Sequence, residues 1–214
     1  MNVKDLVYTP LYTDWYYSYL DIPGLEQIKT ELIKFIQSTE EKYKLNPLYS
    51  NFRAEVVMNK CPLLAKYLSD VGLKEKFNRL LISGDVNVEK RAKVHVDAYD
   101  PQFTTHSLNI GLKDYEQSYT AWYKTKRIKL RDSSPLGLNP STNYAYLFME
   151  EVEEINRIEY KLRPVLVNTT ILHKGISDKS TRLICGLRFW PELTNEDIKK
   201  LGIENPHTQE QDEP

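Results

Sequence analysis

An imidazole and a carboxylate that could bind one metal ion stand two residues apart in the sequence KVHVD, as His95 and Asp97. Side chains two residues apart point to the same face of a β-strand, so both can reach one ion while the intervening valine points away. A histidine and a carboxylate supply two of the three ligands of a facial triad, which leaves coordination positions open for substrate and oxygen. Because short His-x-Asp sequences also arise by chance, the assignment depends on further residues.

A third candidate ligand and a cation follow late in the chain. His173 comes after the β-branched run PVLVNTTIL, near the end of one expected strand, and Arg182 opens the next strand nine residues later. If these strands are antiparallel neighbours, both side chains lie beside the metal. A guanidinium binds a carboxylate through two parallel hydrogen bonds, so Arg182 is expected to anchor an acidic cosubstrate. The alternative is a metal-free jelly roll in which Asp97 and Arg182 form an ion pair.

Short strands are expected to position these residues. After Lys76 the sequence consists of β-branched and aromatic runs separated by turn residues, which is typical of an antiparallel all-β unit. About eight short strands in about 110 residues favour a jelly roll or a closed barrel. Residues 133–143 have the composition of a loop. The strands are expected at residues 78–83, 92–96, 107–112, 118–123, 144–149, 155–162, 164–170 and 181–189.

Helices are expected before and after this unit. Apolar residues recur every three to four positions from Leu25 to Ile36, which predicts an amphipathic helix of about 18 residues that begins after Pro23-Gly24. A shorter helix is expected at residues 62–73. The first 20 residues hold five tyrosines and Trp15, a density that favours packing against a sheet. We therefore expect one domain over residues 1–203, with N-terminal helical support (1–77), a β core (78–190) and a C-terminal helix (191–203), followed by a disordered acidic tail (204–214).

Composition excludes several classes of protein. The 214 residues carry a net charge of −1 and are 41% hydrophobic, which suits one sizeable core and disfavours a binder of duplex DNA. We find no apolar run near the roughly 18 residues that a membrane span needs, and the N-terminus lacks the apolar region of a signal peptide. Cys61 and Cys185 have apolar neighbours and are expected to be buried thiols in a reducing compartment, the cytoplasm.

In order and spacing, His95, Asp97, His173 and Arg182 resemble the motif of iron(II)- and 2-oxoglutarate-dependent oxygenases: His-x-Asp, a distal His, and an Arg about ten residues later. The resemblance covers residues 78–190, including the lead-in RLLISG. Within the family, HSLNIGL followed by SYTAWYK, together with VNTTILHKGISDKSTRLICGLRFW, look most like small hydroxylases akin to aspartyl/asparaginyl and prolyl hydroxylases. The aspartyl-hydroxylase branch usually lacks the carboxylate ligand that Asp97 provides here, and the presence of Asp97 also disfavours a halogenase-like member.

The resemblance implies a mainly β, cupin-like double-stranded β-helix with N-terminal helices. His95, Asp97 and His173 would hold iron(II), and 2-oxoglutarate would chelate the metal while Arg182 binds its distal carboxylate. Oxygen would take the remaining position, and hydroxylation of a C–H bond with release of succinate and carbon dioxide is the expected outcome.

Ser107 and Asn109 share one face of their expected strand and are candidates to hydrogen-bond the cosubstrate. Trp122 or Tyr123 could line the substrate entrance, with core packing as the equal alternative, and Arg188 shares the strand face of Arg182. A basic run follows Tyr123; it could draw an acidic peptide, a phosphorylated substrate or single-stranded nucleic acid, although a solvated strand edge is favoured. His106 and His207 are expected to be bystanders.

The substrate classes, in order of expectation, are a protein or peptide side chain, a free amino acid and a nucleobase, and no membrane partner is expected. Two alternatives stay open. The first is a non-enzymatic jelly-roll module that binds a ligand or a partner. The second is a cupin-like metal enzyme that does not use 2-oxoglutarate and would not require a buried guanidinium at Arg182.

Overall fold

The structure is a computed structural model that describes residues 15–43, 49–83, 106–115, 118–125, 152–161, 163–177 and 182–203. His95, Asp97 and His207 lie outside the described residues, as do the expected strands at 92–96 and 144–149, the loop at 133–143, most of the basic run and the acidic tail. Within the described ranges, no helix combines the length and apolar character needed to cross a lipid bilayer.

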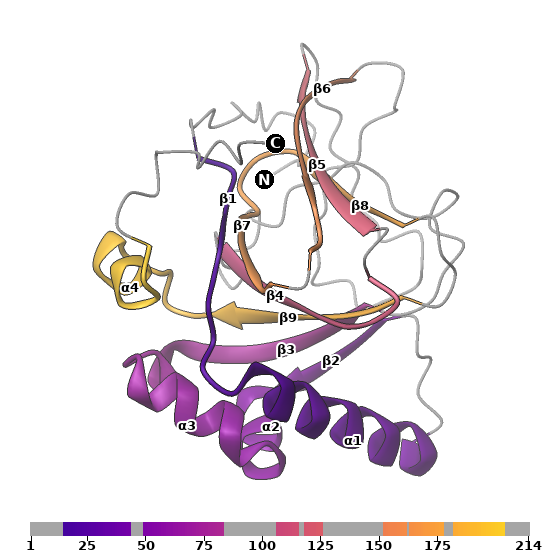
Figure 1. Ribbon diagram of the computed structural model, residues 1–214, viewed down its shortest axis with the longest axis vertical. Helices are drawn as coiled ribbons and strands as arrows, with labels where there is room; N and C mark the ends of the chain where they lie inside the picture. Colours follow the sequence, from indigo (N-terminus) through magenta and orange to yellow (C-terminus); the bar gives the residue numbers. More distant parts are fainter. Residues whose placement is uncertain are drawn as a thin grey trace, which may run out of the picture.

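The larger sheet has six antiparallel strands in the order β1-β7-β4-β9-β3-β2 (Figure 1). In chain order these strands are β1 (Tyr17–Tyr19), β2 (Tyr49–Arg53), β3 (Phe77–Ser83), β4 (His106–Lys113), β7 (Val165–Asn168) and β9 (Leu183–Phe189).

The smaller sheet has three antiparallel strands in the order β6-β5-β8: β6 (Val152–Glu159), β5 (Ser118–Thr125) and β8 (His173–Ser177). The chain alternates between the sheets: β4 lies in the larger, β5 and β6 in the smaller, β7 in the larger, β8 in the smaller and β9 in the larger. Two facing antiparallel sheets connected in this way form a jelly roll, so the expected mainly β fold class is confirmed.

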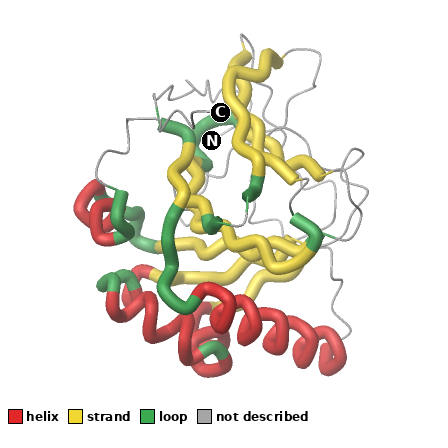
Figure 2. The backbone as a smooth tube through the Cα atoms, viewed as in Figure 1, coloured by secondary structure: helices red, strands yellow, loops and turns green. Residues whose placement is uncertain are grey.

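The helices cover one face of the larger sheet, and the smaller sheet lies on the opposite side (Figures 1 and 2). They are α1 (Leu25–Tyr43), α2 (Ala54–Lys60), α3 (Pro62–Asp70) and the 3-10 helix η2 (Lys74–Lys76), whereas α4 (Asn195–Lys200) lies beyond one end of the sheet. Alternate residues of the central strands, such as Leu80, Leu108 and Leu187, are fully buried against α1 and α3, where Leu32 and Leu68 are also fully buried. The intervening residues of these strands face the smaller sheet.

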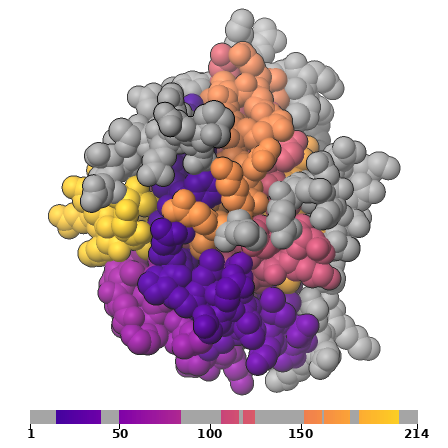
Figure 3. Space-filling model, in the orientation of Figure 1, coloured from indigo at the N-terminus to yellow at the C-terminus, as the bar shows by residue number. Residues whose placement is uncertain are grey.

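The segment before α1 packs against the sheets, as its aromatic content predicts. Trp15 and Leu20 are buried, and β1 extends the larger sheet by pairing with β7. The ring of Tyr17 stacks on that of Trp122 in β5, with ring centroids 5.8 Å apart. In Figure 3 the indigo atoms of this segment lie against both the helical base and the orange strands. The first described residues therefore connect the two sheets along one edge.

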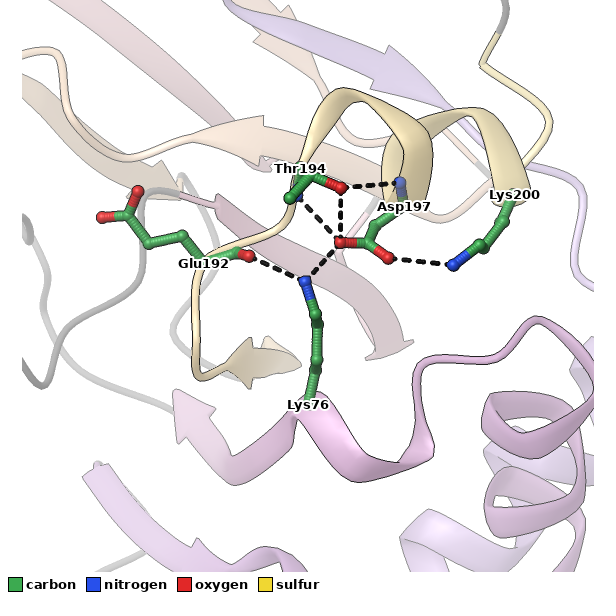
Figure 4. Close-up of polar contacts among 5 residues, drawn as sticks. All are labelled: Lys76, Glu192, Thr194, Asp197 and Lys200. Carbon is green, nitrogen blue, oxygen red and sulfur yellow. Dashed lines mark hydrogen bonds and ion pairs between the residues drawn. The ribbon is translucent and has the colours of Figure 1, made fainter.

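The C-terminal helix α4 is attached to η2, directly before β3, by one carboxylate (Figure 4). Asp197 accepts hydrogen bonds from the backbone N–H and hydroxyl of Thr194, and Thr194 Oγ1 accepts one from the N–H of Asp197, which is a capping box. Lys76 Nζ and Lys200 Nζ also donate to Asp197, and Lys76 Nζ donates to the carbonyl of Glu192. Asp197 thus holds α4 within the region 191–203 where a helix is expected.

The structure corrects three expectations about local structure. His173 begins its own strand, β8, instead of lying near the end of the strand before it. Strand β8, which begins with His173, lies in the smaller sheet, whereas β9, which directly follows Arg182, lies in the larger sheet. The two strands are therefore not hydrogen-bonded neighbours, contrary to expectation. Strands β1 and β2 and helix α2 were not expected as separate elements. The two strands could not be predicted because short polar segments such as YSNFR lack a clear alternating pattern.

Candidate active site

Residues that face the smaller sheet lie on what we call the inner face of the larger sheet. Direct strand pairing arranges them in three rows, each named here after its residue in β9. The Ile184 row consists of Ser83, Ile184 and Gly111; the Gly186 row of Asn51, Leu81, Gly186, Asn109, Val165 and Tyr19; and the Arg188 row of Arg53, Arg79, Arg188, Ser107, Val167 and Tyr17.

Contacts between the sheets align these rows with the smaller sheet. Asn109, of the Gly186 row, donates to the hydroxyl of Tyr160, which lies 2.8 Å from Thr120 Oγ1, and Thr120 is paired with Gly175 in β8. Tyr17, of the Arg188 row, stacks on Trp122, which is paired with His173. The Gly186 row therefore lies level with Gly175, and the Arg188 row lies level with His173.

The backbone fixes one ring nitrogen of His173. Its side chain is in the interior, 7% exposed, and its Nδ1 lies 2.8 Å from the carbonyl oxygen of Ile171. Because a carbonyl can only accept a hydrogen bond, Nδ1 carries the proton and the lone pair of the neutral ring is on Nε2. A backbone carbonyl that fixes the tautomer and ring orientation is the usual outer partner of a metal-bound histidine.

Arg182 brings a buried cation to the other end of this interior. It is 7% exposed, and its Nη1 donates to the carbonyl of Ile176 at 3.2 Å, with a longer contact of 3.5 Å from Nη2 to Ser83 Oγ. Within the described part of the chain, its Nε has no hydrogen-bond partner. Burial lowers the pKa of Arg182, partly opposed by Tyr160, yet a guanidinium stays protonated. A buried cation with an unsatisfied donor is stabilised by an anion.

A glycine in β8 lets the backbone of the smaller sheet lie close to Arg182. Gly175 has no side chain, and a Cβ placed there would be 3.5 Å from Nη2 of Arg182. Along a strand, Gly175 and His173 are about 6.6 Å apart, an interval that a five-carbon dicarboxylate can bridge. The residues present therefore fit a chelating dicarboxylate with one end at His173 and the other at Arg182.

A chain of polar side chains crosses the interior between the sheets. Ser107 Oγ donates to Asn109 Oδ1 at 2.6 Å, Asn109 Nδ2 donates to Tyr160 OH at 2.8 Å, and Tyr160 OH contacts Thr120 Oγ1. Both Ser107 and Asn109 thus face the interior, as their strand alternation predicts. Tyr160 and Thr120 are the site residues that sequence reasoning missed. Thr120 shares strand alternation with Trp122 and could have been found, whereas Tyr160 follows the end of β6 and carries no sequence signal.

The remaining predicted residues have varied positions. Trp122 is fully buried, and its Nε1 donates to the carbonyl of Asn168 at 2.9 Å, so it can contact only a molecule inside the fold. Tyr123 is 3% exposed, and Arg188 is half-buried in its row. The substrate roles of these three residues stay predictions. His95 and Asp97 lie outside the described residues, and the described residues contain no cluster of three metal-binding side chains.

The bystander histidine and the two cysteines lie away from this interior. His106 packs on Trp15, with ring centroids 5.1 Å apart, and burial lowers its pKa to about 4. Cys61 and Cys185 are buried on the helix side of the larger sheet, and burial raises the pKa of each thiol to about 12. Both cysteines are therefore protonated thiols and poor nucleophiles.

No protein-family model and no curated protein sequence matches the chain. Among solved structures, it is similar to the epimerase SnoN in complex with Fe3+, alpha ketoglutarate and nogalamycin RO (13% identity, 82% of this chain and 79% of that chain, TM-score 0.49). It is also similar to HygX from Streptomyces hygroscopicus with nickel and 2-oxoglutarate bound (9% identity, 82% of each chain, TM-score 0.45). A third is a structure of prolyl 4-hydroxylases from Phytophthora capsici (11% identity, 96% of this chain and 80% of that chain, TM-score 0.48).

The fold assignment itself rests on the strands of this chain. In the larger sheet β7, β4, β9 and β3 are consecutive neighbours, and in the smaller sheet β6, β5 and β8 are. Consecutive strands thus wind between two facing sheets, with His173 and Arg182 directed into the space that the sheets enclose. The chain has the fold of a double-stranded β-helix.

Proposed function

We propose that the protein is an iron(II)- and 2-oxoglutarate-dependent oxygenase that hydroxylates a C–H bond, with release of succinate and carbon dioxide. The observation that carries this proposal is the buried guanidinium of Arg182, whose Nε has no hydrogen-bond partner among the described residues. It lies about two strand residues from His173, whose Nδ1 is fixed by a backbone carbonyl. A protein or peptide side chain is the first candidate substrate, followed by a free amino acid and a nucleobase.

Iron(II) would be held by His173 together with His95 and Asp97. An imidazole, a carboxylate and a second imidazole form the facial donor set of this class of metal centre, and His173 has the fixed tautomer that ligation requires. Bound there, the metal supplies the oxidative chemistry, using oxygen and 2-oxoglutarate.

The residues of the interior bind and orient the cosubstrate. Arg182 binds its distal carboxylate through two donors, and the hydroxyls of Tyr160 and Thr120 provide further hydrogen-bonding groups at the neighbouring level. Val165, Val167 and Ile184 on the inner face are each at least nine-tenths buried and exclude water from the same space. Exclusion of water strengthens the ionic contact with Arg182.

The buried Arg182 also separates this proposal from its alternatives. A cupin-like metal enzyme without 2-oxoglutarate has no carboxylate to place against Arg182, and the desolvation of that cation would be uncompensated. A non-enzymatic module could use Arg182 for another acidic ligand, but it would not require the fixed tautomer of His173. The test therefore has to detect metal and cosubstrate together.

The proposal is tested by anaerobic titration of the purified protein with iron(II) and then 2-oxoglutarate. We expect the visible charge-transfer band of the chelated cosubstrate in the wild type and at least about a tenfold weaker affinity for 2-oxoglutarate in Arg182→Gln. Arg157→Gln is the matched control, because Arg157 pairs with Glu154 at the surface of the smaller sheet. Absence of a band in folded, iron-loaded protein would favour the binding module, and equal affinities in the two variants would exclude Arg182 as the anchor.

The type of reaction is tested separately with panels of peptides, amino acids and oligonucleotides. A product heavier by about 16 Da, formed together with succinate, identifies hydroxylation of the panel member concerned. The variant His173→Ala should form neither product nor succinate. Turnover of oligonucleotides alone would reverse the proposed order of substrates.

A further inference from the structure

The connection between β7 and β8, residues 169–172, is buried. Strand β7 ends at Asn168 in the larger sheet and β8 begins at His173 in the smaller sheet, so this connection crosses from one sheet to the other. Each of the six residues from Asn168 to His173 is at most 7% exposed. Connections usually run over the surface, because a buried one needs partners inside the protein for its backbone N–H and C=O groups. The hydrogen bonds around this connection therefore show what keeps it in place.

The side chain of Asn168 bonds to the connection on one side and to the N-terminal segment on the other. Its Oδ1 accepts from the backbone N–H of Thr170 at 2.9 Å and from the hydroxyl of Thr170 at 2.6 Å. Its Nδ2 donates to the carbonyl of Trp15 at 3.2 Å. Because a backbone N–H can only donate and a carbonyl can only accept, these contacts fix which atom of the amide is oxygen and which is nitrogen. The amide therefore has one orientation, with its oxygen toward the connection.

The backbone of Asn168 is also hydrogen-bonded. Its N–H donates to the carbonyl of Tyr16 at 2.8 Å, and its carbonyl accepts from Nε1 of Trp122 at 2.9 Å. Trp122 is itself paired directly with His173 in the smaller sheet. Asn168 is thus joined to the N-terminal segment, to β5 and to the connection, and these three contacts together set its position relative to His173.

The carbonyl that fixes the ring of His173 belongs to the residue directly after Thr170. This carbonyl, of Ile171, lies 2.8 Å from Nδ1 of His173. Because Asn168 binds both the N–H and the hydroxyl of Thr170, it limits the directions in which the carbonyl of Ile171 can point. In a neutral histidine, the hydrogen bond made by one ring nitrogen decides which nitrogen remains to bind a metal. The position of Asn168 is thereby connected to the choice of ring nitrogen.

We propose that Asn168 is a positioning residue for His173. It holds Thr170 so that the carbonyl of Ile171 keeps the proton on Nδ1 and leaves Nε2 to bind iron(II). This inference rests on the proposed function, because it takes His173 as the metal ligand. The N-terminal segment belongs to the same support, since the carbonyl of Trp15 receives the amide of Asn168 from 153 residues away in the sequence.

The tautomer of His173 can be measured in metal-free protein, by NMR correlation of the imidazole nitrogens with the ring protons at a pH that keeps the ring neutral. The chain has four histidines, and His173→Ala identifies the signals of His173. We expect one tautomer, protonated on Nδ1, in the wild type. Asn168→Ala should show a mixture of two tautomers, because the carbonyl of Ile171 is then no longer fixed. Asn168→Asp should keep the single tautomer, because its carboxylate still accepts from Thr170.

Metal affinity gives the second readout. We expect iron(II), titrated anaerobically, to bind Asn168→Ala about tenfold less tightly than the wild type, and Asn168→Asp within about threefold of it. Asp197→Asn is the control for lost stability, because Asp197 holds α4 outside the interior; it should change neither the tautomer nor the affinity for iron(II). If Asn168→Ala does not fold, Thr170→Val takes its place. That variant removes one of the two hydrogen bonds to Oδ1 and should weaken iron(II) binding about threefold.

The outcomes separate this inference from the proposed function. A tautomer that depends on Asn168, in a protein that binds no iron(II), would reject the oxygenase and retain the role of Asn168 in orienting His173. Normal iron(II) binding and an unchanged tautomer in Asn168→Ala would retain the oxygenase and overturn the positioning role. Effects of equal size in Asn168→Ala and Asp197→Asn, or in Asn168→Ala and Asn168→Asp, would also overturn that role.

Discussion

The proposed chemistry depends on two buried side chains, His173 and Arg182. His173 and Arg182 could be identified from residue type and spacing, and the structure places both in the interior. Tyr160 could not be identified, because its hydroxyl reaches Asn109 across 51 residues of sequence and no local pattern encodes that contact. The pairing of Arg53, Arg79 and Arg188 was equally hidden, since strand register is set by tertiary packing.

Glycines on the inner face provide a prediction about packing. A Cβ on Gly111 would lie 2.3 Å from the ring of Tyr115, a buried residue whose hydroxyl accepts a hydrogen bond from Lys29. Gly111→Ala should therefore lower the free energy of unfolding by about 1–3 kcal/mol. At Gly175 the nearest atom is 3.5 Å away, so Gly175→Ala should be neutral or stabilise slightly. Urea denaturation measures both, and equal losses would contradict the packing described for Tyr115.

His106 provides a prediction about pH. Its pKa is about 4 in the folded protein because it is buried, and about 6.5 in an unfolded chain. Between these values the unfolded state binds a proton that the folded state does not, so stability falls as pH is lowered from about 6.5 to about 4. The total loss is on the order of 3 kcal/mol. His106→Leu should show a shallower fall over the same range in urea titrations, and identical slopes would refute the assignment to His106.

At the scale of elements, the long and strongly periodic segments were predictable. Helix α1 occupies residues Leu25–Tyr43, close to the expected range, and β3, β4, β5 and β9 each overlap an expected strand. Strand β8 was missed because HKGIS contains one apolar residue and no alternation. Its omission also led to the wrong neighbour relation between His173 and Arg182, since a strand in the second sheet separates β7 from β9.

The attachment of α4 depends on one carboxylate and predicts an acid-sensitive element. Burial alone would raise the pKa of Asp197, but hydrogen bonds from Lys76, Thr194 and Lys200 outweigh burial and hold the pKa well below its usual range. This stabilisation is present above the unfolded-state pKa of about 3.9 and is lost as pH falls below it.

Asp197→Asn should accordingly lower the free energy of unfolding by about 1–3 kcal/mol at pH 7, because Lys76 loses its ionic partner in a mostly buried position. The difference from wild type should shrink below about pH 4. Asp70→Asn is the control, since Asp70 pairs with Lys66 at the surface and should change stability by less than about 1 kcal/mol. A constant difference at all pH values would contradict the role given to the charge of Asp197.

At the scale of the whole molecule, the larger sheet separates two environments. Its helix-facing side belongs to the main apolar core, and its inner face shares a second, smaller apolar cluster with the smaller sheet and carries the polar groups of the site. The mainly β class and this two-sheet arrangement followed from the alternation of the strands. The position of each row relative to the smaller sheet could not be predicted from this alternation, because it depends on contacts between the sheets, such as that of Tyr17 with Trp122.

Ligands that bind between the two sheets should stabilise the whole fold. A ligand at a concentration of 100 times its dissociation constant adds about 2.7 kcal/mol, which corresponds to an increase in Tm of about 5–10 °C for a chain of this size. We expect anaerobic iron(II) and 2-oxoglutarate each to raise Tm in the wild type, and EDTA to reverse the increase. Arg182→Gln should retain the increase from iron(II) and lose that from 2-oxoglutarate; an equal response to 2-oxoglutarate in both proteins would argue against binding at Arg182.

Strand β9 also bears on how such a protein can diversify. Cys185, Leu187 and Phe189 are buried on its helix side, while Ile184, Gly186 and Arg188 face the interior. Alternate residues of this strand therefore pack in the main core, and the residues between them line the space between the two sheets. Substitutions at the half-buried Arg188 should change the lining of the interior with limited loss of stability, whereas substitutions at the helix-facing positions remove apolar packing from the main core. At Gly186 any side chain would place its Cβ within 3 Å of Ser107 and Asn109. Mutations on the inner face of β9 can thus change the lining of the interior without altering the main core.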